Sequence, residues 1–265
     1  MTAAAIDASA LRASVLPHTD FRAIDVVPVT GSTNADLLAR ATEAPGVVLL
    51  AAAQTQGRGR LGREWLSDPG AGLACSALLA PPVAPARWGW LPLLTGVAAV
   101  EAVRTLGVPN AELKWPNDVL IRGRKVAGIL AERTEPARVV VGIGLNIATA
   151  PAPVEAATSL ANAGSTASPT QVAEALLLAW DRWLARWAEA DGDAEACGLA
   201  GSYRAHCSTL GREVSVAVPG RETTLTGRAI DIDSDGRLVL HAGSTGPTGA
   251  DDLVAVAAGD VQHVR

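Results

Sequence analysis

The chain has few residues of the kinds that build disulfide frameworks or metal sites, and it has no long apolar run. Its three cysteines, Cys75, Cys197 and Cys207, lack metal-ligand spacing and leave an odd thiol. They fit a reducing compartment, and we expect them to be small buried apolar side chains. The four histidines are scattered and indicate neither a metal site nor a catalytic triad. With no run of about 18 apolar residues and no signal-like N-terminus, we expect a cytoplasmic protein without a membrane partner.

An excess of positive charge is also missing. Lysine and arginine total 22 against 27 acidic residues, which gives a net charge of −5. Such a balance offers no electrostatic footprint for DNA, so we expect no DNA partner. At 265 residues the chain can bury a substantial core, and its length allows one or two domains.

Against this acidic background, three arginines and three glycines occupy six of the seven positions 57–63. Glycine lets backbone N–H groups approach a phosphate closely, and guanidinium groups are planar, charged forks that fit phosphate or carboxylate oxygens. We therefore predict an anion-binding loop. The alternative is a loop whose charges are merely solvated.

The same loop satisfies G-x-G-x-x-G at Gly57, Gly59 and Gly62, but its surroundings exclude a dinucleotide-binding turn. Such a turn must open a helix and needs an acidic residue about 20 positions later. Here Asp68-Pro69-Gly70 interrupts any helix, and no Asp or Glu occurs between Pro69 and Glu101. A Walker phosphate loop is excluded as well, because Arg63-Glu64 stands where that motif needs Lys-Ser/Thr.

Three further segments combine polar residues with strand or helix signals. Residues 113–130 have the pattern of a hairpin, in which Lys114 beside Trp115 either faces a buried anion or packs its stem against the ring. The strand pattern at 139–146 contains two glycines, which are typical of a close approach by a ligand. Residues 32–34 begin a helical pattern, where they either cap the helix or offer hydroxyl and N–H groups to a ligand.

The remaining elements are consistent with a protein of two domains. Helices are predicted over 92–106 and after the capping box at 168–171, and the tryptophan stripe of the second helix indicates core packing. From residue 211 onward the chain changes to short alternating strands, which predict a small barrel. Residues 242–250, rich in Gly, Ser and Thr, are typical of a flexible hairpin tip.

The motifs occur in an order that resembles one family. They are Ser-Thr-Asn at 32–34, Gln-x-x-Gly-Arg-Gly-Arg-x-Gly-Arg-x-Trp at 54–65, Lys-Trp-Pro-Asn-Asp at 114–118, Lys-x-Ala-Gly-Ile-Leu at 125–130 and Gly-Ile-Gly-x-Asn at 142–146. Together they resemble biotin protein ligase, also called biotin–[acetyl-CoA-carboxylase] ligase or holocarboxylase synthetase. The agreement continues more weakly to the C-terminus.

This resemblance implies an α+β fold with two domains. Residues 1–210 would form the class II synthetase-like catalytic domain, a mixed sheet with helices on it. Residues 211–265 would form an SH3-like β-barrel that helps to complete the ATP site and to dock the carrier protein. Some family members carry an N-terminal winged helix-turn-helix and also act as repressors. Because the Ser-Thr-Asn motif begins only about thirty residues in, the resemblance is to members without that domain, and we expect no repressor activity.

The implied reaction has two steps. Biotin and ATP first give biotinoyl-5′-AMP and pyrophosphate, and a lysine of a biotin carboxyl carrier protein, from an acyl-CoA carboxylase or pyruvate carboxylase, then takes the biotinyl group. Mg²⁺ is expected with the ATP, although the sequence shows no ligand cluster for it. The rivals are a lipoate-protein ligase and a biotin-sensing regulator that does not transfer its ligand. The family includes monomers and dimers, so we expect a monomer or a weak homodimer.

The resemblance also assigns site residues. Catalysis would involve Lys114, Arg58, Arg60 and Arg63; biotin binding Ser32, Thr33, Gln54, Gly57, Arg58, Arg60, Lys114, Gly128 and Ile129; and ATP or adenylate binding Arg58, Arg60, Arg63, Trp65, Asn117, Lys125 and Asn146.

Overall fold

A computed structural model describes residues 5–65, 68–135, 137–150, 156–219, 223–242 and 252–264. Its first part is a seven-stranded mixed sheet with the strand order β1-β2-β3-β7-β6-β5-β4. The first two strands pair in parallel and the other neighbours pair antiparallel. The strands are β1 (Ala23–Val27), β2 (Val47–Ala51), β3 (Gly72–Leu79), β4 (Ala111–Lys114), β5 (Asp118–Ile121), β6 (Arg124–Thr134) and β7 (Arg138–Asn146).

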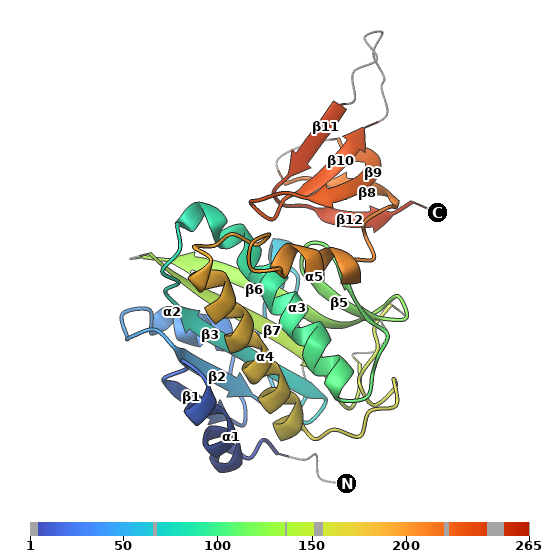
Figure 1. Cartoon of the computed structure of the whole chain (residues 1–265). Coiled ribbons are helices and arrows are strands. Elements are labelled where there is room, and N and C mark those ends of the chain that lie inside the picture. Colours follow the sequence, from blue (N-terminus) through green and yellow to red (C-terminus); the bar gives the residue numbers. More distant parts are fainter. Residues whose placement is uncertain are drawn as a thin grey trace.

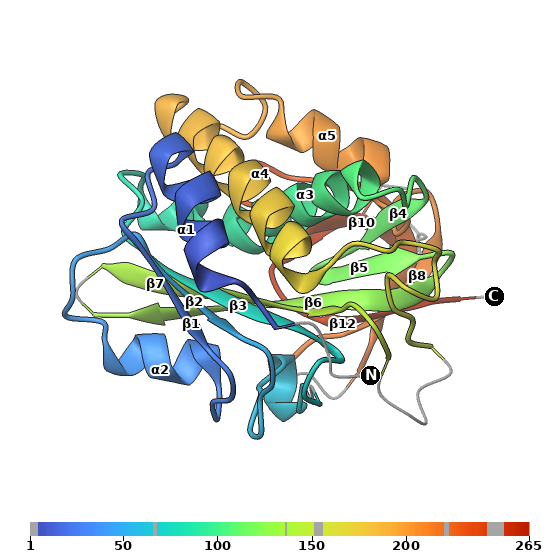
Figure 2. The same cartoon turned by 90° about the horizontal axis from the view of Figure 1, so that it is seen from below.

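Helices lie on both faces of this sheet. One face is covered by α1 (Ala8–Val15), α3 (Trp90–Thr105), α4 (Pro169–Glu189) and α5 (Leu199–His206), and α2 (Thr33–Ala39) lies on the other (Figures 1 and 2). Short 3₁₀ turns occur at η1 (Leu16–His18), η2 (Arg60–Gly62) and η3 (Pro85–Gly89). None of the helices in the described part of the chain is long and apolar enough to cross a membrane.

The period-2 alternation of the strands explains why one face became core and the other became available to α2. In β7, Val139, Val141, Ile143 and Leu145 join the large core beneath the four helices. On the opposite face only Val140 joins the small apolar cluster under α2, and glycines follow it. On this face β7 is therefore apolar under α2 and carries only glycines at positions 142 and 144.

The local signals of the two long helices are confirmed. Ser168 and Gln171 form the expected capping box, and Trp180, Trp183 and Trp187 are buried core residues. The helix expected over 92–106 begins at Trp90, because η3 leads directly into it and Pro92 lies within its first turn.

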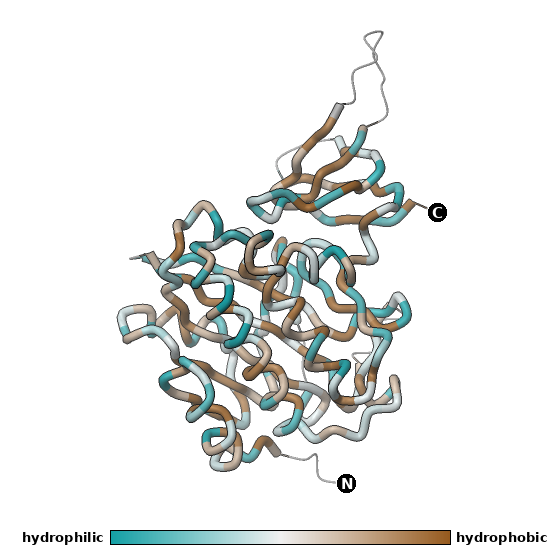
Figure 3. Tube along the Cα trace, in the orientation of Figure 1, coloured by the Kyte–Doolittle hydropathy of each residue, from teal (hydrophilic) through white to brown (hydrophobic). Residues whose placement is uncertain are grey.

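The C-terminal part is a five-stranded antiparallel sheet, β11-β10-β9-β8-β12. Its strands are β8 (Glu213–Ala217), β9 (Leu225–Ile232), β10 (Leu238–Ala242), β11 (Asp252–Val256) and β12 (Asp260–His263). Hydrophobic and hydrophilic positions are mixed along these strands (Figure 3), and burial alternates in β8 and in much of β9. The expected hairpin tip lies, from residue 243 onward, outside the described residues.

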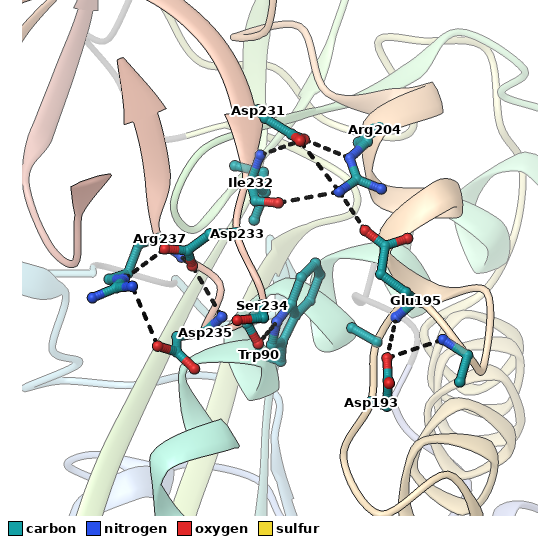
Figure 4. Close-up of polar contacts among 12 residues, drawn as sticks. Trp90, Asp193, Glu195, Arg204, Asp231, Ile232, Asp233, Ser234, Asp235 and Arg237 are labelled. Carbon is teal, nitrogen blue, oxygen red and sulfur yellow. Dashed lines mark hydrogen bonds and ion pairs between the residues drawn. The ribbon is translucent and has the colours of Figure 1, made fainter. Parts of the chain in front are cut away.

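The β9–β10 turn connects the two sheets by docking on the start of α3 (Figure 4). Trp90 Nε1 donates to the carbonyl oxygen of Ser234 at 2.9 Å, and Trp115 Nε1 donates to that of Gly236 at 3.2 Å. Arg204 on α5 pairs with Asp231, Nε to Oδ1, at 2.6 Å. Two indole N–H groups and an ion pair thus fix the C-terminal sheet beside the end of β4.

This contact leaves no room for a side chain at Gly89. A Cβ there would lie 2.3 Å from the carbonyl oxygen of Asp235. We expect Gly89→Ala to lower the free energy of unfolding by ~1–3 kcal/mol, as overpacking does elsewhere. Chemical denaturation would measure the loss. Gly201→Ala is the matched control, since a Cβ at this helical position meets nothing within 4 Å; an equal loss in both variants would contradict the explanation.

Candidate active site

A pocket opens on the α2 side of the large sheet, between the glycine- and arginine-rich loop, the β4–β5 turn and the start of β12. Most of the expected site residues line it: Ser32, Thr33, Gln54, Arg58, Arg60, Arg63, Trp65, Lys114, Asn117, Lys125, Gly128 and Ile129. Residues separated by more than two hundred positions, from Ser32 to Val261, meet here.

Two expected site residues lie elsewhere. Gly57 lines the adjoining cavity, and it must be glycine because a Cβ there would lie 2.1 Å from the carbonyl oxygen of Trp65. Asn146, expected near the adenine, is 6% exposed and donates from Nδ2 to the carbonyl oxygen of Thr158 at 3.0 Å. Asn146 is not one of the described residues that line the pocket. Its amide fixes the chain after β7.

The start of α2 supplies the pocket's polar floor. Ser32 Oγ accepts from the backbone N–H of Ala35, so the predicted helix cap is confirmed. Thr33 donates from its backbone N–H to Gln54 Oε1 at 2.8 Å, and its hydroxyl lies 3.0 Å from the same oxygen. Ser76 Oγ lies 2.7 Å from the Thr33 hydroxyl. These side chains are 8% exposed or less, so their hydrogen bonds replace those lost to water.

Glycines in β6 and β7 let side chains lie directly on the sheet. A Cβ at Gly142 would be 2.0 Å from Asn34 Oδ1, and one at Gly144 would be 2.2 Å from Trp65 Nε1. In this structure the groups that lie on these glycines are the side chains of Asn34 and Trp65, and the approach of a ligand stays a prediction. The indole also lies 5.5 Å from Lys125 Nζ in a cation–π contact.

Three of the five pocket cations are paired with carboxylates. Arg58 contacts Glu132 at 3.3 Å, Lys125 Nζ contacts Asp118 Oδ1 at 2.6 Å, and Arg63 contacts Asp260 of β12. Each carboxylate comes from a strand, so these pairs tie the loop and Lys125 to the two sheets.

Arg60 and Lys114 differ from these three. Within the described part of the chain neither makes an ion pair, and the one side-chain hydrogen bond of Arg60 there runs from Nη1 to the amide oxygen of Asn117, at 3.4 Å. Burial lowers the pKa of the Arg60 guanidinium, against the pull of Asp118 and Asp260. These two half-buried cations, which make no ion pair with the described residues, are the pocket charges best placed to gain from an anionic ligand.

The contact between Arg63 and Asp260 joins the loop to the C-terminal sheet. A hydrogen bond from Arg63 is the main cause that lowers the pKa of Asp260, and the charges of Lys114 and Arg60 act in the same direction. The lowered pKa means that the pair stabilises the folded state above the usual carboxyl pKa, and that this contribution is lost as the pH falls.

We expect Asp260→Asn to loosen this loop. Trypsin cleaves after arginine, and an exposed pair of this kind is worth up to about 1 kcal/mol, so cleavage in residues 58–63 should accelerate about two- to fivefold. Timed digestion with mass spectrometry measures the rate at each site. Asp231→Asn is the control, because it removes the ion pair to Arg204, another contact between the two sheets, without contacting the loop. Equal cleavage rates in both variants would contradict a tether through Asp260.

Sequence reasoning did not identify Asn34, Ser76, Asp118, Glu132 or Asp260 as site residues. Ser76 gave no signal because every residue of β3 is buried. Glu132 and Asp260 gave none because their arginine partners are far away in sequence. Asp118 lies only seven positions before its partner Lys125, but the sequence does not show that the two side chains face each other. The three cysteines are buried, as predicted. In the described ranges no group of three His, Cys, Asp or Glu side chains could hold a metal ion.

Comparison with known proteins decides the family. The Biotin/lipoate A/B protein ligase family matches residues 24–146, and the Biotin protein ligase C terminal domain matches residues 209–264. The biotin–[acetyl-CoA-carboxylase] ligase of Mycobacterium tuberculosis is 44% identical over 254 residues, which cover 92% of this chain and 90% of that protein. The chain belongs to the biotin protein ligase family. It is an enzyme of the ligase class, and the predicted fold is confirmed.

Two other biotin protein ligases show how far the similarity extends. The biotin protein ligase of Aquifex aeolicus, solved in complex with biotin and ATP, superimposes with a TM-score of 0.75 at 27% identity, covering 92% of this chain and all of that one. The bifunctional ligase/repressor BirA of Escherichia coli is 40% identical over 139 residues, which are 51% of this chain and 43% of BirA. The similarity to BirA is thus confined to part of each protein.

Proposed function

We propose that this biotin protein ligase joins biotin to ATP, releasing pyrophosphate, and then transfers the biotinyl group from biotinoyl-5′-AMP to a lysine of a biotin carboxyl carrier protein. The observation that carries this proposal is the arrangement of charge in the pocket. A neutral, hydrogen-bonding floor at Thr33 and Gln54 lies in the same pocket as Arg60 and Lys114, two cations that have no carboxylate partner among the described residues. Biotin has a neutral ring and an acidic tail, and ATP adds a phosphate. The ring would suit the neutral floor, and the acidic tail and the phosphate would suit the two cations.

In the first step a biotin carboxylate oxygen attacks the α-phosphorus, the new P–O bond forms, and pyrophosphate leaves with the electrons of the broken bond. Negative charge accumulates on the phosphate oxygens, and fixed cations stabilise it best where water is excluded. We assign this role to Lys114 and Arg60. In the second step the lysine amine attacks the carbonyl carbon of the mixed anhydride, and AMP leaves.

The loop of residues 54–65 is proposed to cover the pocket during the reaction. Its arginines Arg58 and Arg63 are anchored to Glu132 and Asp260, which holds the loop across the pocket. A closed loop shields the anhydride from hydrolysis. We propose that Arg58 and Arg63 serve mainly as anchors and that Trp65, Asn117 and Lys125 surround the nucleotide.

Mg²⁺ is proposed to arrive with the ATP phosphates. The described residues form no metal-binding group, and Asp118 and Asp260 are already paired with cations. Magnesium commonly keeps waters and substrate oxygens as its ligands, so no resident site in the protein is required.

The remaining expectations stay predictions. The net charge of −5 supports the absence of a DNA partner, and the buried thiols suit the cytoplasm. The carrier is proposed to belong to an acyl-CoA carboxylase or pyruvate carboxylase. A monomer or weak homodimer is expected, and sedimentation with and without biotin and ATP would measure it.

Acid-dependent ATP–pyrophosphate exchange tests the function directly. Exchange with biotin, and none with lipoate or octanoate, is the expected result. Exchange with lipoate alone would identify a lipoate ligase, and tight biotin binding without exchange would identify a sensor. Either outcome would overturn the proposal.

A further inference from the structure

A chain of hydrogen bonds runs beneath the pocket floor and ends at a carboxylate. Asn34 Nδ2 donates to Glu132 Oε2 at 2.8 Å, Ser76 Oγ donates to Asn34 Oδ1 at 2.7 Å, and the hydroxyls of Ser76 and Thr33 lie 2.7 Å apart. We call Glu132, Asn34 and Ser76 the floor relay. They come from β6, α2 and β3, and Asn34 reaches its place because Gly142 beneath it has no side chain.

The carboxylate sets the direction of each hydrogen bond in the relay. Since a carboxylate only accepts, Asn34 must turn its amide nitrogen toward Glu132, where it also donates to the carbonyl oxygen of Leu130 at 3.3 Å. The amide oxygen of Asn34 then accepts a hydrogen bond from the Ser76 hydroxyl. With that proton used, the Ser76 oxygen can only accept from Thr33.

Gln54, like Ser76, can accept the hydroxyl proton of Thr33 and so direct it away from the ligand. Gln54 Oε1 receives the backbone N–H of Thr33, which can only donate, so the amide oxygen must point toward α2. The single hydroxyl proton of Thr33 therefore goes to Gln54 or to Ser76, and the Thr33 oxygen keeps lone pairs for the ligand. Gln54 Nε2 has no partner among the described residues and remains a donor.

We propose that the floor relay determines ring specificity by holding Thr33 as an acceptor beside the donor Gln54. A cyclic urea presents N–H groups next to a carbonyl oxygen, the complement of this pair. A dithiolane ring presents neither, and binding it would leave the buried Thr33 and Gln54 groups without partners. This inference rests on the proposed biotin substrate, and it makes Ser76, Asn34 and Glu132 positioning residues that act through Thr33.

Ser76→Ala tests the relay by removing one buried hydroxyl and leaving the strand in place. We expect biotin affinity, measured by calorimetry, to fall about five- to twentyfold. Desthiobiotin, which keeps the cyclic urea, should lose the same factor, so that the preference over lipoate shrinks. The value of kcat at saturating biotin should stay near that of the unmodified protein, because the relay does not contact the reacting atoms. Thr95→Val is the matched control: its hydroxyl is equally buried but donates to the carbonyl oxygen of Leu91 inside α3, and affinity should not change.

A double-mutant cycle separates a relay from a merely structural role. If Ser76 acts through Thr33, Ser76→Ala should add little to the loss already caused by Thr33→Val; independent roles would give losses that multiply. Glu132→Gln provides a second variant of nearly unchanged shape, whose amide can donate and so removes the directional constraint. Its biotin affinity should fall as well.

The outcomes distinguish the inference from the function on which it rests. If the unmodified protein binds no biotin, the proposed function fails. If it binds biotin and the Ser76 and Glu132 variants bind equally well, or if the losses in the cycle multiply, the relay alone is overturned.

Discussion

Lys114→Ala should lower biotin-dependent ATP–pyrophosphate exchange about a hundredfold to a thousandfold, the loss typical of removing one preorganised group that stabilises charge in a transition state. Lys114 ends β4 beside the docked C-terminal turn, is half-buried, and has no ion pair among the described residues. Its charge is therefore not neutralised by a described carboxylate of the protein. The fold should persist, because no described hydrogen bond or ion pair is lost.

Lys125→Ala is the comparison for this result. Lys125 is paired with Asp118 and lies against Trp65, so its removal should disturb the local pocket but reduce exchange much less. Circular dichroism and thermal unfolding would verify that both variants fold. Unchanged exchange in Lys114→Ala, or a larger loss in Lys125→Ala, would refute the assigned role.

Arg60→Ala should have the second largest effect, a decrease in exchange of about a hundredfold. Arg63→Ala should cost about tenfold or less, since its charge is shared with Asp260 and its side chain is 64% exposed. Steady-state kinetics with varied ATP and biotin would measure both. The two arginines belong to one loop and differ in whether a carboxylate already neutralises them, so each serves as a control for the other. Equal losses of exchange in the two variants would contradict the distinction between Arg63, an anchor paired with a carboxylate, and Arg60, a cation that binds the ligand.

The sequence predicted those parts of the molecule whose signals are local. The cap at Ser32, the capping box at Ser168 and the hairpin pattern over 113–130 depend on neighbours within a few positions, and the structure confirms them. The strand β3 was not recognised, because all of its residues are buried and no alternation marks it. The short elements α1, β1, β11 and β12 owe their formation to the surfaces they pack against.

The site shows the same division. Its cations and glycines were found because they crowd into one segment with a recognisable spacing. The carboxylates that organise them were not, since Glu132 lies 74 positions from Arg58 and Asp260 lies 197 positions from Arg63. An isolated acidic residue in a strand resembles any solvated side chain until the fold shows what faces it. Ion pairs across the fold are therefore the part of the site that required the structure.

The chain contains only two lysines, Lys114 and Lys125, and both line the pocket. Every other basic side chain counted with them is an arginine, whose guanidinium stays protonated and is a poor nucleophile. A mixed anhydride that escaped the pocket would thus meet no lysine amine on the protein that made it. Outside the pocket the enzyme therefore offers its reactive product no lysine of its own, and a carrier lysine meets no competition from lysines on the enzyme surface.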